Sequence, residues 1–166
     1  DNAIACNRDR ILGAENGGRG SEDYERVFNQ MVNLWCDYPS VKPYSLNQRL
    51  AESARRLSES QHVRIYHDHA MIKPPGETSK ETNWHQDSPY WPMDPIGSLS
   101  AWVAVDDVTT ENGCLHFIPK SHKFGKLEPI ALGQEGESIV KKMEEEEYKL
   151  PDSVSMEMPA GGVTFH

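Results

Sequence analysis

The sequence predicts an α+β protein that is mainly β, with its helices confined to the first third of the chain. Between residues 24 and 58, apolar side chains recur at steps of three and four, which is the period of an amphipathic helix. After Ser60 the pattern changes to short apolar runs separated by Pro, Gly and Asn, which indicates antiparallel strands. A length of 166 residues predicts one domain, 1–166, large enough to bury a core.

Residues 22–58 make up the predicted helical part, and the four glycines within residues 13–21 indicate a flexible loop before it. Ser21 and the two acidic residues after it predict the start of a first helix over 24–35. A second helix is expected from Ser45 or Asn47 to about Ser58. The apolar positions are Tyr24, Val27, Phe28, Met31, Leu34 and Trp35 in the first helix, and Leu46, Leu50, Ala54 and Leu57 in the second.

Residues 61–166 make up the predicted β part. Short runs bounded by turn residues predict six strands in it. The runs are Val63–Tyr66, Ala70–Ile72, Leu99–Val105, Cys114–Ile118, Val154–Met158 and Val163–Phe165. The charged stretch Lys141–Lys149 predicts a solvated helix inserted between two of these strands.

Charge and composition narrow the class of function. The chain carries 17 Lys and Arg against 26 Asp and Glu, a net charge of −9, which is too acidic for a protein that neutralises phosphates of nucleic acid or of a membrane. A small-molecule substrate is therefore expected. No apolar run reaches the roughly 18 residues that span a bilayer, and three widely spaced cysteines do not suggest a disulfide framework. These features favour a soluble protein in the reducing cytoplasm.

One tripeptide carries the strongest chemical signal, His85-Gln86-Asp87. In an extended strand, residues two positions apart point to the same side, so an imidazole and a carboxylate would be presented together. Two histidines and one carboxylate form the facial triad of non-haem Fe(II) oxygenases. The tripeptide needs a third ligand from elsewhere in the chain, and by itself it is a weak signal.

The surroundings of this tripeptide make the signal specific. Three blocks occur in order: residues 66–76 (YHDHAMIKPPG), residues 84–92 (WHQDSPYWP) and residues 112–122 (NGCLHFIPKSH). From about residue 24 to the end, the chain resembles the phytanoyl-CoA dioxygenase family. The resemblance implies a double-stranded β-helix, a jelly-roll of the cupin type, with helices on its N-terminal side. It also implies Fe(II), the cosubstrate 2-oxoglutarate and O₂, with ascorbate as an accessory reductant.

The resemblance also implies a reaction and a set of site residues. The reaction is hydroxylation of an unactivated C–H bond of a small organic substrate, with oxidative decarboxylation of 2-oxoglutarate to succinate and CO₂. His85 and Asp87 match the first two iron ligands and form the catalytic pair, and the carboxylate at Asp87 favours hydroxylation over halogenation. The implied cosubstrate residues are Gln30 (on the first predicted helix), His69, Gln86 and Trp102, and the implied substrate residues are Lys73, Tyr90 and Trp91.

The C-terminal run Gly162–His166 matches the beginning of a family motif in which a later histidine is the distal iron ligand and a later arginine pairs with 2-oxoglutarate. The third ligand is therefore expected just beyond His166, with direct ligation by His166 as the alternative. On this interpretation the domain is truncated at both ends and lacks its C-terminal strands.

Two other functions remain open. One is a non-catalytic or regulatory binding protein of the same fold, and the other is a cupin-type metal enzyme that does not use 2-oxoglutarate.

Overall fold

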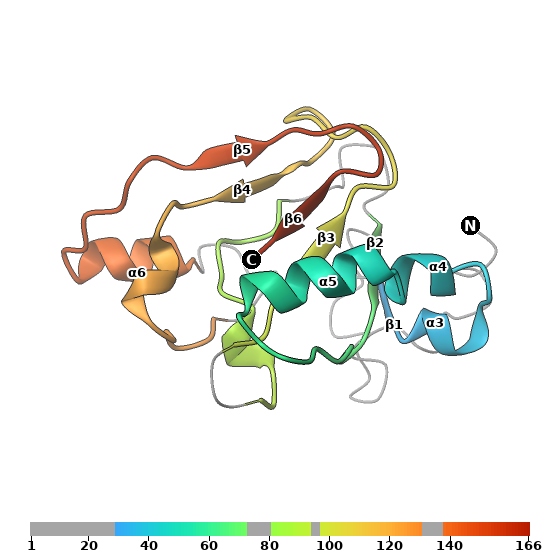
Figure 1. Cartoon of the computed structure of the whole chain (residues 1–166). Coiled ribbons are helices and arrows are strands. Elements are labelled where there is room, and N and C mark those ends of the chain that lie inside the picture. Colours follow the sequence, from blue (N-terminus) through green and yellow to red (C-terminus); the bar gives the residue numbers. More distant parts are fainter. Residues whose placement is uncertain (1–28, 73–80, 94–96, 131–137) are drawn as a thin grey trace, which may run out of the picture. The chain divides into compact units, whose positions relative to one another are not determined.

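The computed structural model describes residues 29–72, 81–93, 97–130 and 138–166. The chain divides into two compact units, 1–80 and 81–166. Figure 1 shows the helices and strands in chain order. The flexible loop predicted over residues 13–21 lies outside the described residues.

The first unit is built on an antiparallel pair of strands, β1 (Asn29–Val32) and β2 (His69–Ile72), with Met31 opposite Ala70. Met31 is 1% exposed and Leu34 is 3% exposed, so the core of this unit lies where β1 ends. The helices that follow β1 are α3 (Leu34–Asp37), α4 (Lys42–Ser45) and α5 (Gln48–Leu57).

The helix predicted over residues 24–35 is wrong in its described part. Residues 29–32 form β1 because their backbone pairs with β2, nearly 40 positions later, instead of forming local helical hydrogen bonds. Asn33 then turns the chain in the left-handed region (φ 59°), and only α3 is helical. Gln30 therefore lies on a strand, opposite Met71, and not on a helix.

Asp68, in the 66–76 block, has a structural role at the start of α3. Its two carboxylate oxygens accept hydrogen bonds from the backbone N–H of Leu34 (2.8 Å) and of Trp35 (2.9 Å) at the start of α3. The Ser45 hydroxyl donates to the same carboxylate at 2.8 Å. One side chain therefore satisfies two of the free N–H groups of α3 and ties α4 to the start of β2.

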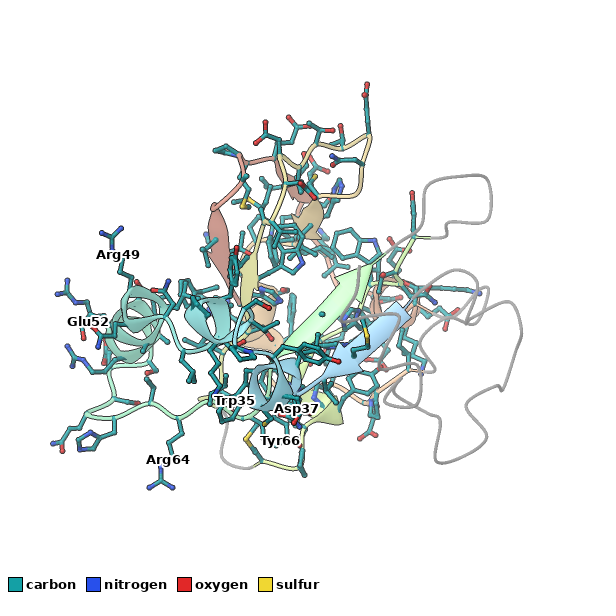
Figure 2. All side chains as sticks on the ribbon, turned by 90° about the vertical axis from the view of Figure 1, so that its right-hand side faces the viewer. Trp35, Asp37, Arg49, Glu52, Arg64 and Tyr66 are labelled. Atoms are coloured by element: carbon teal, nitrogen blue, oxygen red, sulfur yellow. The ribbon has the colours of Figure 1, made fainter. Side chains whose placement is uncertain are left out.

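The second predicted helix is confirmed as α5, and its N-cap is one of the two residues expected. The Asn47 side chain accepts a hydrogen bond from the backbone N–H of Arg49 at 2.9 Å, as N-cap residues do. Figure 2 shows Arg49 and Glu52 pointing outward from this helix. The strand predicted at 63–66 is wrong, because these residues pair with no other strand among the described residues and are exposed.

The second unit contains two antiparallel strand pairs, visible in Figure 1: β3 (Ala101–Val103) with β6 (Val163–Phe165), and β4 (Leu115–Phe117) with β5 (Val154–Met156). Trp102 lies opposite Thr164. All four strands fall within predicted runs, and β2 of the first unit covers the run predicted at 70–72 and begins one residue earlier. The short helices are η3 (Ser88–Tyr90), η4 (Ser121–Phe124) and α6 (Ile139–Glu145).

The helix predicted at 141–149 is α6, but it begins earlier and is less solvated than expected. It spans Ile139–Glu145, and Ile139 and Met143, one turn apart, are buried. Its charged residues cover only the remaining faces. The described residues thus contain few helices and small antiparallel sheets, which fits the α+β class, although α6 lies outside the first third of the chain, where the helices are expected. None of the described helices has the length and apolar character needed to cross a membrane.

Candidate metal site

His85 and Asp87 approach each other closely, with His85 Nε2 3.2 Å from Asp87 Oδ1. The sequence predicts that an extended strand presents the two side chains together. This prediction is wrong, because residues 81–87 belong to no described sheet. Asp87 has helical backbone angles (φ −73°, ψ −42°) and precedes the 3₁₀ helix η3, where Pro89 fits the first turn. A turn, rather than strand alternation, brings the imidazole and the carboxylate together.

The other ring nitrogen of His85 is held by the backbone. Nδ1 lies 2.7 Å from the carbonyl oxygen of Asn83. Because a carbonyl can only accept, Nδ1 carries the hydrogen, and Nε2 is the nitrogen left to bind a cation or a second proton. Metal-binding histidines are commonly oriented in this way.

Asp87 has two further neighbours, which lie far from it in the sequence. Ser100 Oγ donates a hydrogen bond to Asp87 Oδ2 at 2.5 Å, and His166 Nε2 lies 3.6 Å from the same oxygen. Ser100 and His166 also exchange two backbone hydrogen bonds (2.8 and 3.1 Å), which extend the β3–β6 ladder by one pair. Ser100 was missed from the sequence, although its position two residues before Trp102 places both on one face of β3.

The pKa values show how this cluster balances charge. Burial opposes ionisation of Asp87, but hydrogen bonds from His85 and Ser100 and the nearby imidazoles outweigh it, so its pKa is lowered to about 2. The hydrogen bond to Asp87 raises the pKa of His85 against the effect of burial. Burial lowers the pKa of His166, and the charge of Asp87 opposes that effect only in part. A proton on His85 Nε2 would occupy the same place between the pair as a metal cation.

The pair fits Fe(II) in both donor chemistry and spacing. Adjacent ligands of an octahedral ion at bond lengths of about 2.1 Å lie about 3 Å apart, close to the 3.2 Å between His85 Nε2 and Asp87 Oδ1. A facial triad needs three ligands, and this pair offers the donor types of two of them. Across residues 29–72, 81–93, 97–130 and 138–166, no group of three or more His, Cys, Asp or Glu side chains is arranged to hold a metal.

The face of the β3–β6 sheet that carries the Asp87 partners has a second notable feature. Thr164 is two residues from His166 and opposite Trp102, so all three share this face. Thr164 is 7% exposed, and its hydroxyl has no hydrogen-bond partner among the described residues. Trp102 is half-buried. An unsatisfied hydroxyl beside the predicted cosubstrate residue is the kind of group that a bound polar molecule would satisfy.

Three other predicted site residues are close to the pair in the sequence: Gln86 lies between His85 and Asp87, and Tyr90 and Trp91 follow them. The Gln86 amide donates to the carbonyl of Gly125 and accepts from the N–H of Leu127, both at 2.9 Å. The Tyr90 hydroxyl donates to the carbonyl of Ile130 at 2.6 Å and accepts from its N–H at 3.0 Å. The polar groups of both residues are thus bound to backbone. Trp91 is half-buried directly after η3.

The remaining predicted residues belong to the first unit. His69 lies on β2 opposite Val32, with its ring centroid 6.0 Å from that of His67. Gln30 lies two positions along the same ladder. Their roles toward the cosubstrate stay predictions, as does the role of Lys73, which lies outside the described residues.

Comparison with known proteins points to the same family as the sequence motifs. Residues 14–166 match the family described as Phytanoyl-CoA dioxygenase (PhyH). A phytanoyl-CoA dioxygenase of Arabidopsis thaliana is 31% identical over 125 residues, which cover 75% of this chain and 43% of that protein. A phytanoyl-CoA dioxygenase domain-containing protein 1 homolog of Dictyostelium discoideum is 33% identical over 86 residues, covering 50% and 31%. The chain spans less than half the length of these relatives. No solved structure matches it significantly.

Proposed function

Because this chain belongs to the phytanoyl-CoA dioxygenase family, we propose that it is part of an Fe(II)- and 2-oxoglutarate-dependent dioxygenase that hydroxylates a small organic molecule. The family has a cupin-like fold, and its members are dioxygenase-like enzymes. We propose further that the antiparallel strands belong to a double-stranded β-helix. The observation that carries the proposal is the approach of His85 Nε2 to Asp87 Oδ1 at 3.2 Å, with each side chain oriented by a separate hydrogen bond.

When bound, Fe(II) with 2-oxoglutarate and O₂ supplies the oxidising power for hydroxylation of an unactivated C–H bond, with release of succinate and CO₂. His85 Nε2 and Asp87 Oδ1 would hold the metal. The carbonyl of Asn83 and the hydroxyl of Ser100 orient these two ligands. A histidine beyond position 166, or His166 itself, would complete the triad.

The pocket for the cosubstrate would be lined by the β3–β6 face, where Trp102 offers an aromatic surface and Thr164 a buried hydroxyl that no described residue bonds. The substrate would be a small organic molecule rather than a nucleic acid or a membrane lipid surface, because the chain has a net charge of −9. Trp91, directly after η3, would border it on the side of the metal pair.

The direct test is metal binding by the natural polypeptide that contains these 166 residues. Co(II) can replace Fe(II), and its visible absorption reports the ligands. We expect His85→Ala and Asp87→Ala to abolish Co(II) binding with folding retained. His62→Ala removes an exposed histidine of the first unit and should bind Co(II) like the unmodified protein. Unchanged Co(II) affinity in His85→Ala would refute the ligand assignment.

The second test measures succinate formed from 2-oxoglutarate with Fe(II) and O₂. Succinate formation, with or without a hydroxylated product, supports the dioxygenase. Metal binding that depends on His85 without any succinate would instead support a cupin-type metal enzyme or a regulatory binding protein of the same fold.

A further inference from the structure

We propose that Gln86 and Tyr90 are positioning residues, which brace the turn carrying His85 and Asp87 against the segment Gly125–Ile130. Residues Gly125–Ile130 form the brace segment. The inference rests on the proposed function, since it concerns how the metal pair is held. It gives both side chains a different role from the cosubstrate and substrate contacts expected from the sequence.

Gln86 connects the ligand turn to the brace segment in two places. It stands between His85 and Asp87, and its amide bonds the carbonyl of Gly125 and the N–H of Leu127, each at 2.9 Å. These two backbone groups flank a single residue, so the side-chain amide pairs with the brace segment much as a neighbouring strand would. Rotation of Gln86 away from the segment would break both bonds.

Tyr90 provides a second connection on the other side of Asp87. Its hydroxyl both donates to and accepts from the backbone of Ile130, which is itself 5% exposed. Its ring meets the His85 ring edge to face, with centroids 6.2 Å apart and planes at 78°. Tyr90 therefore links the first metal ligand directly to the end of the brace segment.

A third connection is made by Trp84, the residue just before His85. The N–H of Ile139, the first residue of α6, donates to the carbonyl of Trp84 at 3.2 Å. Residues Gly125–Ile130 and Ile139 are thus bonded to the chain just before the pair, between its members and after it. Because residues 81–87 lack a sheet ladder, these bonds perform the task that strand pairing usually performs for a ligand.

The polar atoms of Gln86 and Tyr90 are therefore occupied by backbone groups of the brace segment. Loss of such outer contacts typically reduces metal affinity 10- to 100-fold while the ligands themselves remain. We expect Gln86, which stands between the ligands, to matter more for metal affinity than Tyr90.

The test combines metal affinity with hydrogen exchange of single amides in the natural polypeptide. Gln86→Met keeps the length of the side chain and removes both hydrogen bonds. We expect Co(II) affinity to fall about 10- to 100-fold and the Leu127 amide to exchange faster even without metal. Gln86→Glu keeps an oxygen for the Leu127 N–H, so protection of that amide and part of the affinity should return.

Tyr90→Phe keeps the ring against His85 and removes the hydroxyl. We expect faster exchange at Ile130 and a smaller loss of Co(II) affinity than in Gln86→Met. Tyr148→Phe is the matched control, because Tyr148 lies in the same connection between β4 and β5 as the brace segment. Its ring centroid is 5.2 Å from that of Phe124. Neither the exchange at Leu127 and Ile130 nor the Co(II) affinity should change in this control.

The outcomes separate the two proposals. Faster exchange at Leu127 with unchanged Co(II) affinity in Gln86→Met would overturn the positioning role and leave the proposed function intact. Unchanged exchange in both variants would show that the brace does not exist. If the unmodified protein binds no Co(II), the proposed function fails and the positioning role with it, while the exchange data still report whether the brace forms.

Discussion

The Ser100 hydroxyl donates to Oδ2 of Asp87, which leaves Oδ1 of that carboxylate as the oxygen facing His85. The carboxylate is therefore oriented by a residue on the β3–β6 sheet, 13 positions further along the chain. In metal sites, such contacts set the direction of the ligand lone pairs. The relationship makes Ser100 the support of the second predicted ligand.

We predict that Ser100→Ala weakens metal binding without unfolding the protein. Asp87 would lose its fixed rotamer, and Co(II) affinity should fall about 10- to 100-fold in a titration followed by absorption. Ser98→Ala is the control, since the Ser98 hydroxyl contacts only the Met93 sulfur among the described residues, at 3.8 Å. Equal affinities in the two variants would show that Ser100 does not orient the ligand.

Thr164→Val is predicted to stabilise the ligand-free protein. Valine has nearly the same shape, and the substitution removes a buried hydroxyl that has no hydrogen-bond partner in the part of the chain that the structure describes. Leaving such a group unsatisfied costs about 1–3 kcal/mol, so the free energy of unfolding in urea should rise by about 1 kcal/mol or more. Thr110→Val should act in the opposite direction, because the Thr110 hydroxyl donates to Glu157 at 3.0 Å. A less stable Thr164→Val would mean that the hydroxyl has a partner.

Gly162→Ala is predicted to destabilise the fold through a steric clash. A Cβ atom at this position would lie 2.7 Å from the sulfur of Met158 and 2.9 Å from its Cβ, which is fixed to the backbone. Overpacking of this kind costs about 1–3 kcal/mol, measurable as a lower urea midpoint. The control is Gly97→Ala, since no atom of the described residues lies within 4 Å of a Cβ there. An unchanged midpoint in Gly162→Ala would show that Met158 moves aside freely.

Glu52 is predicted to make stability depend on pH. Hydrogen bonds from Arg55 and then Arg56 lower its pKa from 4.5 to about 2 in the folded protein. A group with a lowered folded pKa stabilises the fold above its unfolded pKa, and this contribution disappears as the pH falls from about 4.5 to about 2. Glu52→Gln should therefore be less stable than the unmodified protein at pH 6, and the gap in urea midpoint should close toward pH 2.

The control for this prediction is Glu59→Gln. Glu59 lies just beyond α5 and forms no ion pair among the described residues. The urea midpoint of the Glu59→Gln variant should follow that of the unmodified protein at every pH. A gap for Glu52→Gln that stays constant with pH would contradict the linkage.

Local patterns predicted the elements whose hydrogen bonds and caps are local. The helix α5 and its Asn47 cap follow from apolar spacing and one capping residue, and β3 to β6 fall within predicted runs. The helix predicted over 24–35 failed because residues 29–32 satisfy their backbone groups with β2. Apolar spacing over such a short segment cannot report a partner strand nearly 40 positions away.

For the candidate site, the sequence by itself determined which donor types are available, namely the imidazole of His85 and the carboxylate of Asp87, two positions apart. Only the tertiary structure decided how they are held, because the hydroxyl of Ser100 and the backbone groups bonded by Gln86 come from distant parts of the chain. Contacts across 13 to 41 positions leave no periodic trace, since each requires only one suitable side chain at each end. Chain folding, rather than residue spacing, therefore sets the geometry of the pair.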